Sequence, residues 1–200
     1  MKWNLMLMVG AGMVLAGAAV AQSSMGGMDH SQMSGSAMSG MTVQMDMSGL
    51  EKLQGKAFDR AFLSMMVPHH QMAVDMSKAV LPKSKDATVK TWANAVIKDQ
   101  NREINQMNTL LKSYGGSNTA MANMMKSGMS GMADMVTKAK NPDVAYVQGM
   151  LPHHASAIEM ANMALEKTSD PRVLKLARDI VRAQAQEMYD FRTWLMKRGL

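Results

Sequence analysis

The sequence predicts an all-α protein, an antiparallel four-helix bundle made of two repeated helical hairpins. Residues 58–115 align without a gap onto residues 142–199, so matching residues lie 84 positions apart over a whole pair of helices. Within each pair, apolar residues recur at alternating spacings of three and four, as they do in coiled coils. Proline and glycine breaks separate the two members of each pair. A duplicated two-helix unit accounts for these observations together.

The N-terminal residues 1–21 are typical of a secretory signal peptide. Lys2 precedes the apolar stretch Leu5–Val20, and small residues up to Ala21 are followed by polar ones, so we expect cleavage after Ala21. The alternative, an uncleaved membrane anchor, is disfavoured because the stretch is short for a bilayer span. We therefore expect a periplasmic or secreted protein with no stable membrane anchor.

Residues 22–49 are rich in Met, Gly and Ser. Glycines interrupt any helical pattern there, so the segment predicts a flexible tail. Met28 and His30 place a thioether and an imidazole in this tail, which favours low-specificity capture of metal ions. The alternative is that methionine is only a flexible filler in a low-complexity segment.

The predicted bundle domain covers residues 50–200. In its first repeat, residues 50–115, one helix is expected over about 51–81. A second helix is expected from Asp86, a plausible N-cap, to the glycines that begin at Gly115.

The second repeat, residues 142–200, carries clearer helix boundaries. Asp170 is its predicted N-cap, Pro171 occupies the first helical position, and Gly199 ends the last helix. Between the repeats, the Met-rich connector 116–141 must cross from one end of the bundle to the other. We expect it to be partly helical.

The motif Met-x-Pro-His-His occurs twice, at Met66–His70 and at Met150–His154, and contains four of the five histidines. In each copy the Met and the second His lie one helical turn apart. Met72 and Met76 continue the helix face of the first copy, and Met160 follows the second copy. Two or three ligands on one helix could therefore reach a single ion.

Polar residues interrupt the apolar stripes at matching positions of both repeats. In an antiparallel hairpin, His69 lies level with Gln100, and His153 with Gln184, about 22 Å from the turn. Burying such groups without partners costs about 1–3 kcal/mol each. A closed hydrogen-bond network of histidine, glutamine and glutamate is one explanation. The thioethers favour metal binding instead, with the polar residues supporting the ligands: Asp59, Gln100, Glu103, Asp143, Gln184 and Glu187.

The ligand types select the metal. The chain has 27 Met and no Cys. Thioether and imidazole without thiolate favour Cu(I), with Ag(I) by analogy, while imidazoles also accept Cu(II), and Zn is the main competitor at the His pairs. Methionine also remains a ligand in an oxidising compartment where thiols would be lost.

Composition and spacing exclude several other functions. The formal charge of +6 is spread along helices and aromatic residues make up only 4%, so we expect no nucleic-acid binding. No carboxylate stands three residues before any His, as di-iron helical bundles require, and no catalytic triad or phosphate loop occurs, so we expect no enzyme. The alternatives are a ferritin-like metal-dependent oxidase and a metal-free structural bundle that uses Met as an oxidant sink.

The pattern of Phe58–Met76, echoed by Met150–Met160, resembles the bacterial domain-of-unknown-function family 305 over roughly residues 50–195. The resemblance implies a ferritin-like four-helix bundle, export, and copper binding through Met and His in copper tolerance. Gly149 and Ser156 stand where the first repeat has Met65 and Met72, so we expect a weaker second site. The resemblance carries the ligand role over to His69, His70, Met66, Met76, His153, His154, Met150 and Met160.

We therefore expect an exported protein that sequesters copper ions or hands them over, contributing to copper tolerance or homeostasis. A copper exporter or a periplasmic chaperone would be its protein partner.

Overall fold

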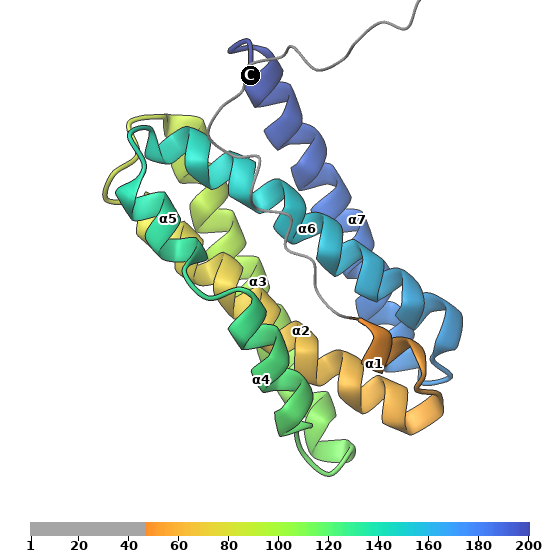
Figure 1. The fold of residues 1–200 in the computed structure, drawn as a ribbon. Coiled ribbons are helices and arrows are strands. Elements are labelled where there is room, and N and C mark those ends of the chain that lie inside the picture. The colour runs from red at the N-terminus through yellow and green to blue at the C-terminus, as the bar shows by residue number, and fades with distance from the viewer. Residues whose placement is uncertain (1–46) are drawn as a thin grey trace, which may run out of the picture. The chain divides into compact units, whose positions relative to one another are not determined.

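The computed structural model describes residues 47–200, which belong to one compact unit. The predicted signal peptide and nearly all of the predicted tail, including Met28 and His30, lie outside the described residues. The part described is helical throughout, apart from turns and loops, so the all-α prediction is confirmed (Figure 1). Its elements are α1 (Ser48–Glu51), α2 (Gly55–Val80), α3 (Ala87–Ser113), α4 (Thr119–Gly128), α5 (Met132–Lys138), α6 (Pro142–Lys167) and α7 (Pro171–Met196).

Two long hairpins, α2–α3 and α6–α7, form the two repeats. The predicted caps are present: the Asp86 carboxylate accepts hydrogen bonds from the backbone of α3, and the Asp170 carboxylate accepts one from the backbone of α7. An N-cap carboxylate satisfies backbone N–H groups that have no partner within the helix. Pro171 stands at the start of α7, and Gly199 adopts a positive φ of 71° just beyond its end.

The hairpins meet mainly along α2 and α6, which run antiparallel. Near one end the Ser77 and Tyr146 hydroxyls lie 2.9 Å apart, and near the middle His69 contacts Ser156. α3 and α7 touch through side chains, with the Trp92 and Phe191 rings 5.1 Å apart in an edge-on arrangement. The four long helices therefore share one core, and its buried histidines lie where α2 meets α6.

The connector between the repeats forms α4 and α5, which lie along α2 (Figure 1). The Asn118 side chain caps α4, and its backbone N–H donates to the Ser64 hydroxyl of α2 over 2.8 Å. The connector is thus an ordered layer of the domain, and it buries Met125, Met129 and Met132 in the core.

Both motif prolines lie inside long helices: Pro68 in α2 and Pro152 in α6. Each helix continues through its proline, so the His pairs that follow remain in a regular helix. Among the helices of residues 47–200, none combines the length and the apolar character needed to cross a bilayer.

Candidate metal centre

The four motif histidines form one buried layer at the middle of α2 and α6. Each is at most 1% exposed. The His69 and His153 rings lie closest, with centroids 3.8 Å apart, and His70 and His154 flank them at 6.2 and 5.9 Å from their neighbours. The duplicated motif thus becomes one continuous group of imidazoles across the α2–α6 contact, which we call the histidine layer.

The outer two histidines bind carboxylates from the partner helix of their own hairpin. His70 Nε2 lies 2.8 Å from Glu103 Oε2, and His154 Nε2 lies 2.6 Å from Glu187 Oε2. A carboxylate that accepts a hydrogen bond from one ring nitrogen orients the ring and leaves the other nitrogen free to act as a ligand. Glu103 and Glu187 therefore hold the two outer rings through Nε2.

The inner two histidines bind each other's helix. His153 Nε2 lies 2.9 Å from the His69 carbonyl oxygen, which only accepts, so this nitrogen carries the proton and donates. The Ser156 hydroxyl donates to the His153 carbonyl, so it accepts from His69 Nε2 at 2.8 Å. In the sequence, Ser156 stands out only because the first repeat has Met72 at the equivalent position. In the structure its hydroxyl joins the two hairpins by accepting a hydrogen bond from His69.

These contacts leave every Nδ1 of the layer without a hydrogen-bond partner among the described residues. Since each Nε2 carries the donated proton, each Nδ1 presents a lone pair; an N–H there would be a buried donor with no acceptor. Burial lowers the pKa of His69 and His153 well below the usual value, and the neighbouring histidines lower it further. The inner pair is therefore neutral, the form in which imidazole binds metal.

Two glutamines add more unpaired polar atoms. Gln100 on α3 and Gln184 on α7 are 3% and 2% exposed, and neither side-chain amide has a partner among the described residues. Each stands one turn before the glutamate of its own helix. The closed hydrogen-bond network considered from the sequence is therefore not formed: Glu103 binds His70, and Gln100 binds no side chain.

The predicted thioether ligands line the same two helices. Met72 is partly buried, and the others are fully buried: Met66, Met76, Met150 and Met160. Within residues 47–200, no three side chains of His, Asp or Glu gather closely enough to hold an ion by themselves. An ion in this layer would therefore need sulfur as well as nitrogen donors, and that donor set suits soft cations.

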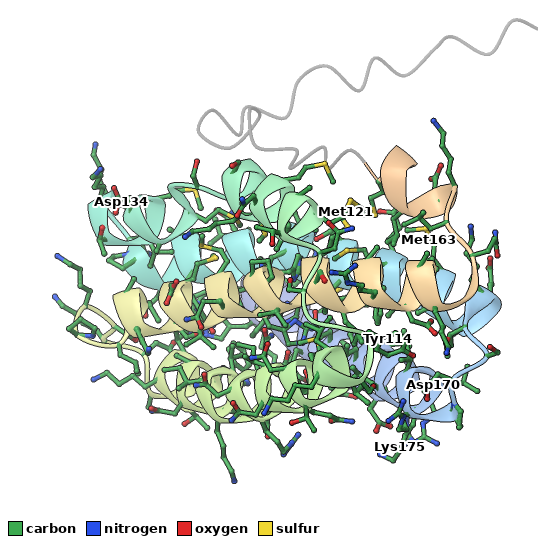
Figure 2. The ribbon with its side chains drawn as sticks, turned by 90° about the horizontal axis from the view of Figure 1, so that it is seen from below. Tyr114, Met121, Asp134, Met163, Asp170 and Lys175 are labelled. Atoms are coloured by element: carbon green, nitrogen blue, oxygen red, sulfur yellow. The ribbon has the colours of Figure 1, made fainter. Side chains whose placement is uncertain are left out.

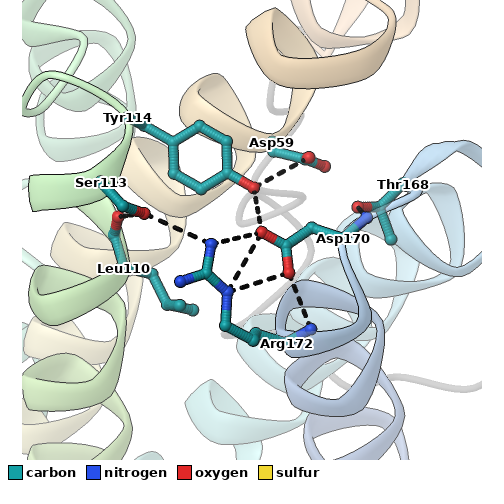
Figure 3. A network of polar contacts seen from close by, with 7 residues as sticks. All are labelled: Asp59, Leu110, Ser113, Tyr114, Thr168, Asp170 and Arg172. Carbon is teal, nitrogen blue, oxygen red and sulfur yellow. Dashed lines mark hydrogen bonds and ion pairs between the residues drawn. The ribbon is translucent and has the colours of Figure 1, made fainter.

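Asp59 and Asp143 lie away from the histidine layer. The Tyr114 hydroxyl contacts Asp59 Oδ2 at 3.0 Å and Asp170 Oδ2 at 2.8 Å, and Arg172 joins the same cluster (Figures 2 and 3). Asp143 accepts from a backbone N–H at the opposite end of α2. Burial and the two carboxylates raise the pKa of Tyr114, while Arg172 lowers the pKa of Asp170. These aspartates tie helix ends together.

Comparison with known families identifies the chain. A model of the domain of unknown function DUF305 matches residues 14–111, 65–141 and 143–200. This chain belongs to the DUF305 family. The resemblance drawn from the repeated motif is therefore confirmed, and it extends across both hairpins.

Solved structures of similar proteins share the fold of this DUF305 chain. CopM in its Cu(I)-bound form is 32% identical with a TM-score of 0.60, and the match covers 70% of this chain and 96% of CopM. CopM is also known in Cu(II)-bound, Ag-bound and apo forms. A DUF305 protein from Streptomyces coelicolor is 26% identical with a TM-score of 0.63, and the match covers 70% of this chain and 93% of that one.

One curated relative has no described function. An uncharacterised protein of Acanthamoeba polyphaga mimivirus is 43% identical over 53 residues, which make up 26% of this chain. The match spans about a third of that protein's length, 35%.

Proposed function

We propose that this DUF305 protein is an exported, non-catalytic copper-binding protein that holds Cu(I), and Ag(I) by the same chemistry, in the histidine layer. The observation that carries the proposal is the set of four buried Nδ1 lone pairs without partners. Buried polar atoms are nearly always satisfied in native proteins, so several orphans in one layer call for a partner. A metal ion is the partner that imidazole lone pairs bind best.

Sulfur donors favour a soft ion over the alternatives. Met66 and Met150 stand one turn before His70 and His154 and are fully buried. Thioethers bind Cu(I) and Ag(I) well and contribute little to Zn, Mg or Ca sites, while the imidazoles also admit Cu(II). CopM, with 32% identity, has been captured with Cu(I), Cu(II) and Ag, which supports the same cargo here.

The protein's own residues would hold the cargo in place. Glu103 and Glu187 orient the outer rings through Nε2 and increase the basicity of Nδ1. The Glu187 side chain is 27% exposed and that of Glu103 is 10% exposed, so the layer is nearer to solvent on the α7 side. We place loading and release of the ion on that side. Buffering copper or passing it to an exporter or a periplasmic chaperone would follow.

Copper titration of the mature protein tests the proposal. Cu(I) would be titrated against a competing chromogenic chelator, in the wild type and in a variant with Ala at His69, His70, His153 and His154. We expect the variant to lose the tightest binding. Circular dichroism would check its fold. A Met66→Leu/Met150→Leu variant keeps core volume and should also weaken binding, and Met124→Leu, at an exposed site, is the matched control.

A thermal melt gives a second readout. An ion that binds only the native state must raise the melting midpoint, so Ag(I) should stabilise the wild type and not the four-histidine variant. Equal Cu(I) affinity in the wild type and that variant would show that the histidine layer is not the copper-binding site. Oxygen turnover by a carboxylate-bound di-metal centre would instead support the oxidase alternative.

A further inference from the structure

A glycine in α6 lies against the ends of two methionines from other helices. A Cβ atom at Gly149 would lie 2.8 Å from Cε of Met76 in α2 and 3.2 Å from Cε of Met135 in α5. Both methyl groups therefore reach the same point on α6, no farther apart than the sum of these two distances. Gly149 stands one helical turn before His153, on the same face of the helix.

The residue at the position of Gly149 differs between the two repeats. Gly149 is the counterpart of Met65, which is buried one turn before His69 in α2. The first repeat therefore carries thioethers three and four residues before its inner histidine, at Met66 and Met65, whereas the second repeat carries only the one three residues before, at Met150. Met135, from the connector, brings the end of its thioether side chain to Gly149, where the second repeat has no methionine of its own.

We propose that Met135 is a metal ligand of the second half of the histidine layer, where Met135, Met76 and His153 bind one soft cation, Cu(I) or Ag(I). This inference rests on the proposed function and adds a connector residue to its site. It also reverses the expectation that the second site is weaker. Met76 belongs to the first repeat, but α2 packs against α6 so that the Met76 side chain reaches Gly149 in the second repeat.

The glycine itself fits this role. Glycine within a helix costs about 1 kcal/mol relative to alanine. The backbone of Gly149 has no positive φ that would require glycine. What glycine provides is space for the Met76 methyl in its present position, since a Cβ there would force the end of this flexible side chain to shift. At Gly49, by contrast, a Cβ would meet Met121 at an ordinary contact distance of 3.7 Å.

The position of Met135 also suits an incoming ion. Met76 is fully buried, whereas Met135 is partly exposed. α5 is held against both α2 and α6, with Met132 and Val136 buried beneath it. A partly exposed thioether and a fully buried one therefore meet at Gly149, one helical turn from His153.

A silver titration tests this inference. Ag(I) avoids redox chemistry, and its affinity would be measured by competition in the wild type and in Met135→Leu. We expect Met135→Leu to weaken one site at least about tenfold, since even loss of an outer-shell partner weakens a metal site by 10–100-fold. Met132→Leu, a buried methionine of the same helix, is the control and should bind as the wild type does.

A rescue variant separates ligation from packing. In Met135→Ala/Gly149→Met, α6 carries its own thioether, as α2 does at Met65, and the flexible Met76 side chain can shift to admit it. We expect this double variant to bind Ag(I) more tightly than Met135→Ala alone. Packing alone predicts no such recovery.

Oxidation in the wild type provides a readout that needs no variant. Peroxide converts accessible Met to its sulfoxide, and a bound ion occupies the sulfur lone pair. Peptide mass spectrometry should show that Ag(I) protects Met135 and leaves the exposed Met124 unprotected. If the wild type binds Ag(I) while Met135 stays unprotected and Met135→Leu binds equally well, the inference is wrong and the proposed function stands. If the wild type binds no Ag(I), the proposed function itself fails.

Discussion

The two hairpins keep the same histidine–glutamate pairs and differ in the residues around them. His70 binds Glu103 in the first hairpin and His154 binds Glu187 in the second, with matching atoms and nearly matching distances of 2.8 and 2.6 Å. The surroundings differ in exposure, since the second glutamate is closer to solvent. The two histidine–glutamate pairs have therefore stayed symmetric, while their exposure to solvent has not.

The ends of the hairpins show the same contrast. Tyr114 and Arg198 are repeat counterparts, and each binds the N-cap aspartate of the other hairpin: Tyr114 binds Asp170, and Arg198 binds Asp86. Tyr114 also reaches the buried Asp59, whereas the half-exposed Arg198 stacks on a tryptophan. The two contacts lie at equivalent positions of the repeat. They differ in burial, and we expect the more buried one to contribute more to the free energy of unfolding.

The largest effect expected is on the pH dependence of apo-protein stability. The histidine layer and the aspartates at the helix ends should lose their contributions to stability at different pH values. Burial lowers the pKa of His69 and His153 below 6.5, so the unfolded state takes up protons first as pH falls. Stability is then full above about pH 6.5 and declines below it, by about 1.4 kcal/mol per pH unit for each histidine. Denaturant unfolding at a series of pH values would measure the slope.

The ends respond at a different pH. Arg172 lowers the pKa of Asp170 below its ordinary value of 3.8, so the stability that this carboxylate contributes is present above about pH 3.8 and is lost as pH falls further. A His69→Gln/His153→Gln variant should flatten the decline that begins below about pH 6.5 and leave the later loss below about pH 3.8 unchanged. Apo-protein stability that does not change between pH 7 and pH 5 would contradict the neutral, buried state of the inner histidines.

A second expected effect compares the two supporting glutamates. Glu103→Gln should weaken Ag(I) binding by about 10–100-fold, because the His70 ring loses its charged acceptor. Glu187→Gln should weaken it less, since Glu187 is more exposed and water can replace part of the contact. Competition titrations of both variants would measure the difference. An equal loss, or a larger loss at Glu187, would show that exposure does not set the strength of the two half-sites.

The smallest effect expected concerns the two ties at the helix ends. Tyr114→Phe removes the donor from the buried Asp59 and should cost about 1–3 kcal/mol. Arg198→Ala should cost less than about 1 kcal/mol, because the Arg198 side chain is 40% exposed and Trp194 still donates to Asp86. Urea unfolding of both variants at neutral pH would rank them. A larger loss for Arg198→Ala would overturn the role assigned to burial.

Local chemistry explains which features could be predicted. Asp86 and Asp170 cap their own helices, so a few neighbouring residues suffice to identify them. The histidine pairs stand out because the motif recurs at a constant displacement within amphipathic helices. Their burial follows from the apolar stripe on which they lie.

Contacts between distant segments needed the structure. Nothing near Ser156 in the sequence indicates that it accepts from His69, and nothing near Met135 indicates that its methyl reaches Gly149. Tyr114 likewise meets Asp59 only because two helix ends converge. Each of these contacts depends on which faces of α2, α3, α5 and α6 meet, and on the rotation of each helix about its own axis.

The sequence by itself determined the all-helical duplicated fold, the caps and the proposal of imidazole and thioether donors, because helix periodicity and side-chain chemistry are local properties. The tertiary structure decided that the four histidines form one layer, that each presents an unpaired Nδ1, and that the connector brings a methionine to the second repeat. These outcomes depend on the packing of helices far apart in the chain, where a rotation of one helix would exchange one set of partners for another.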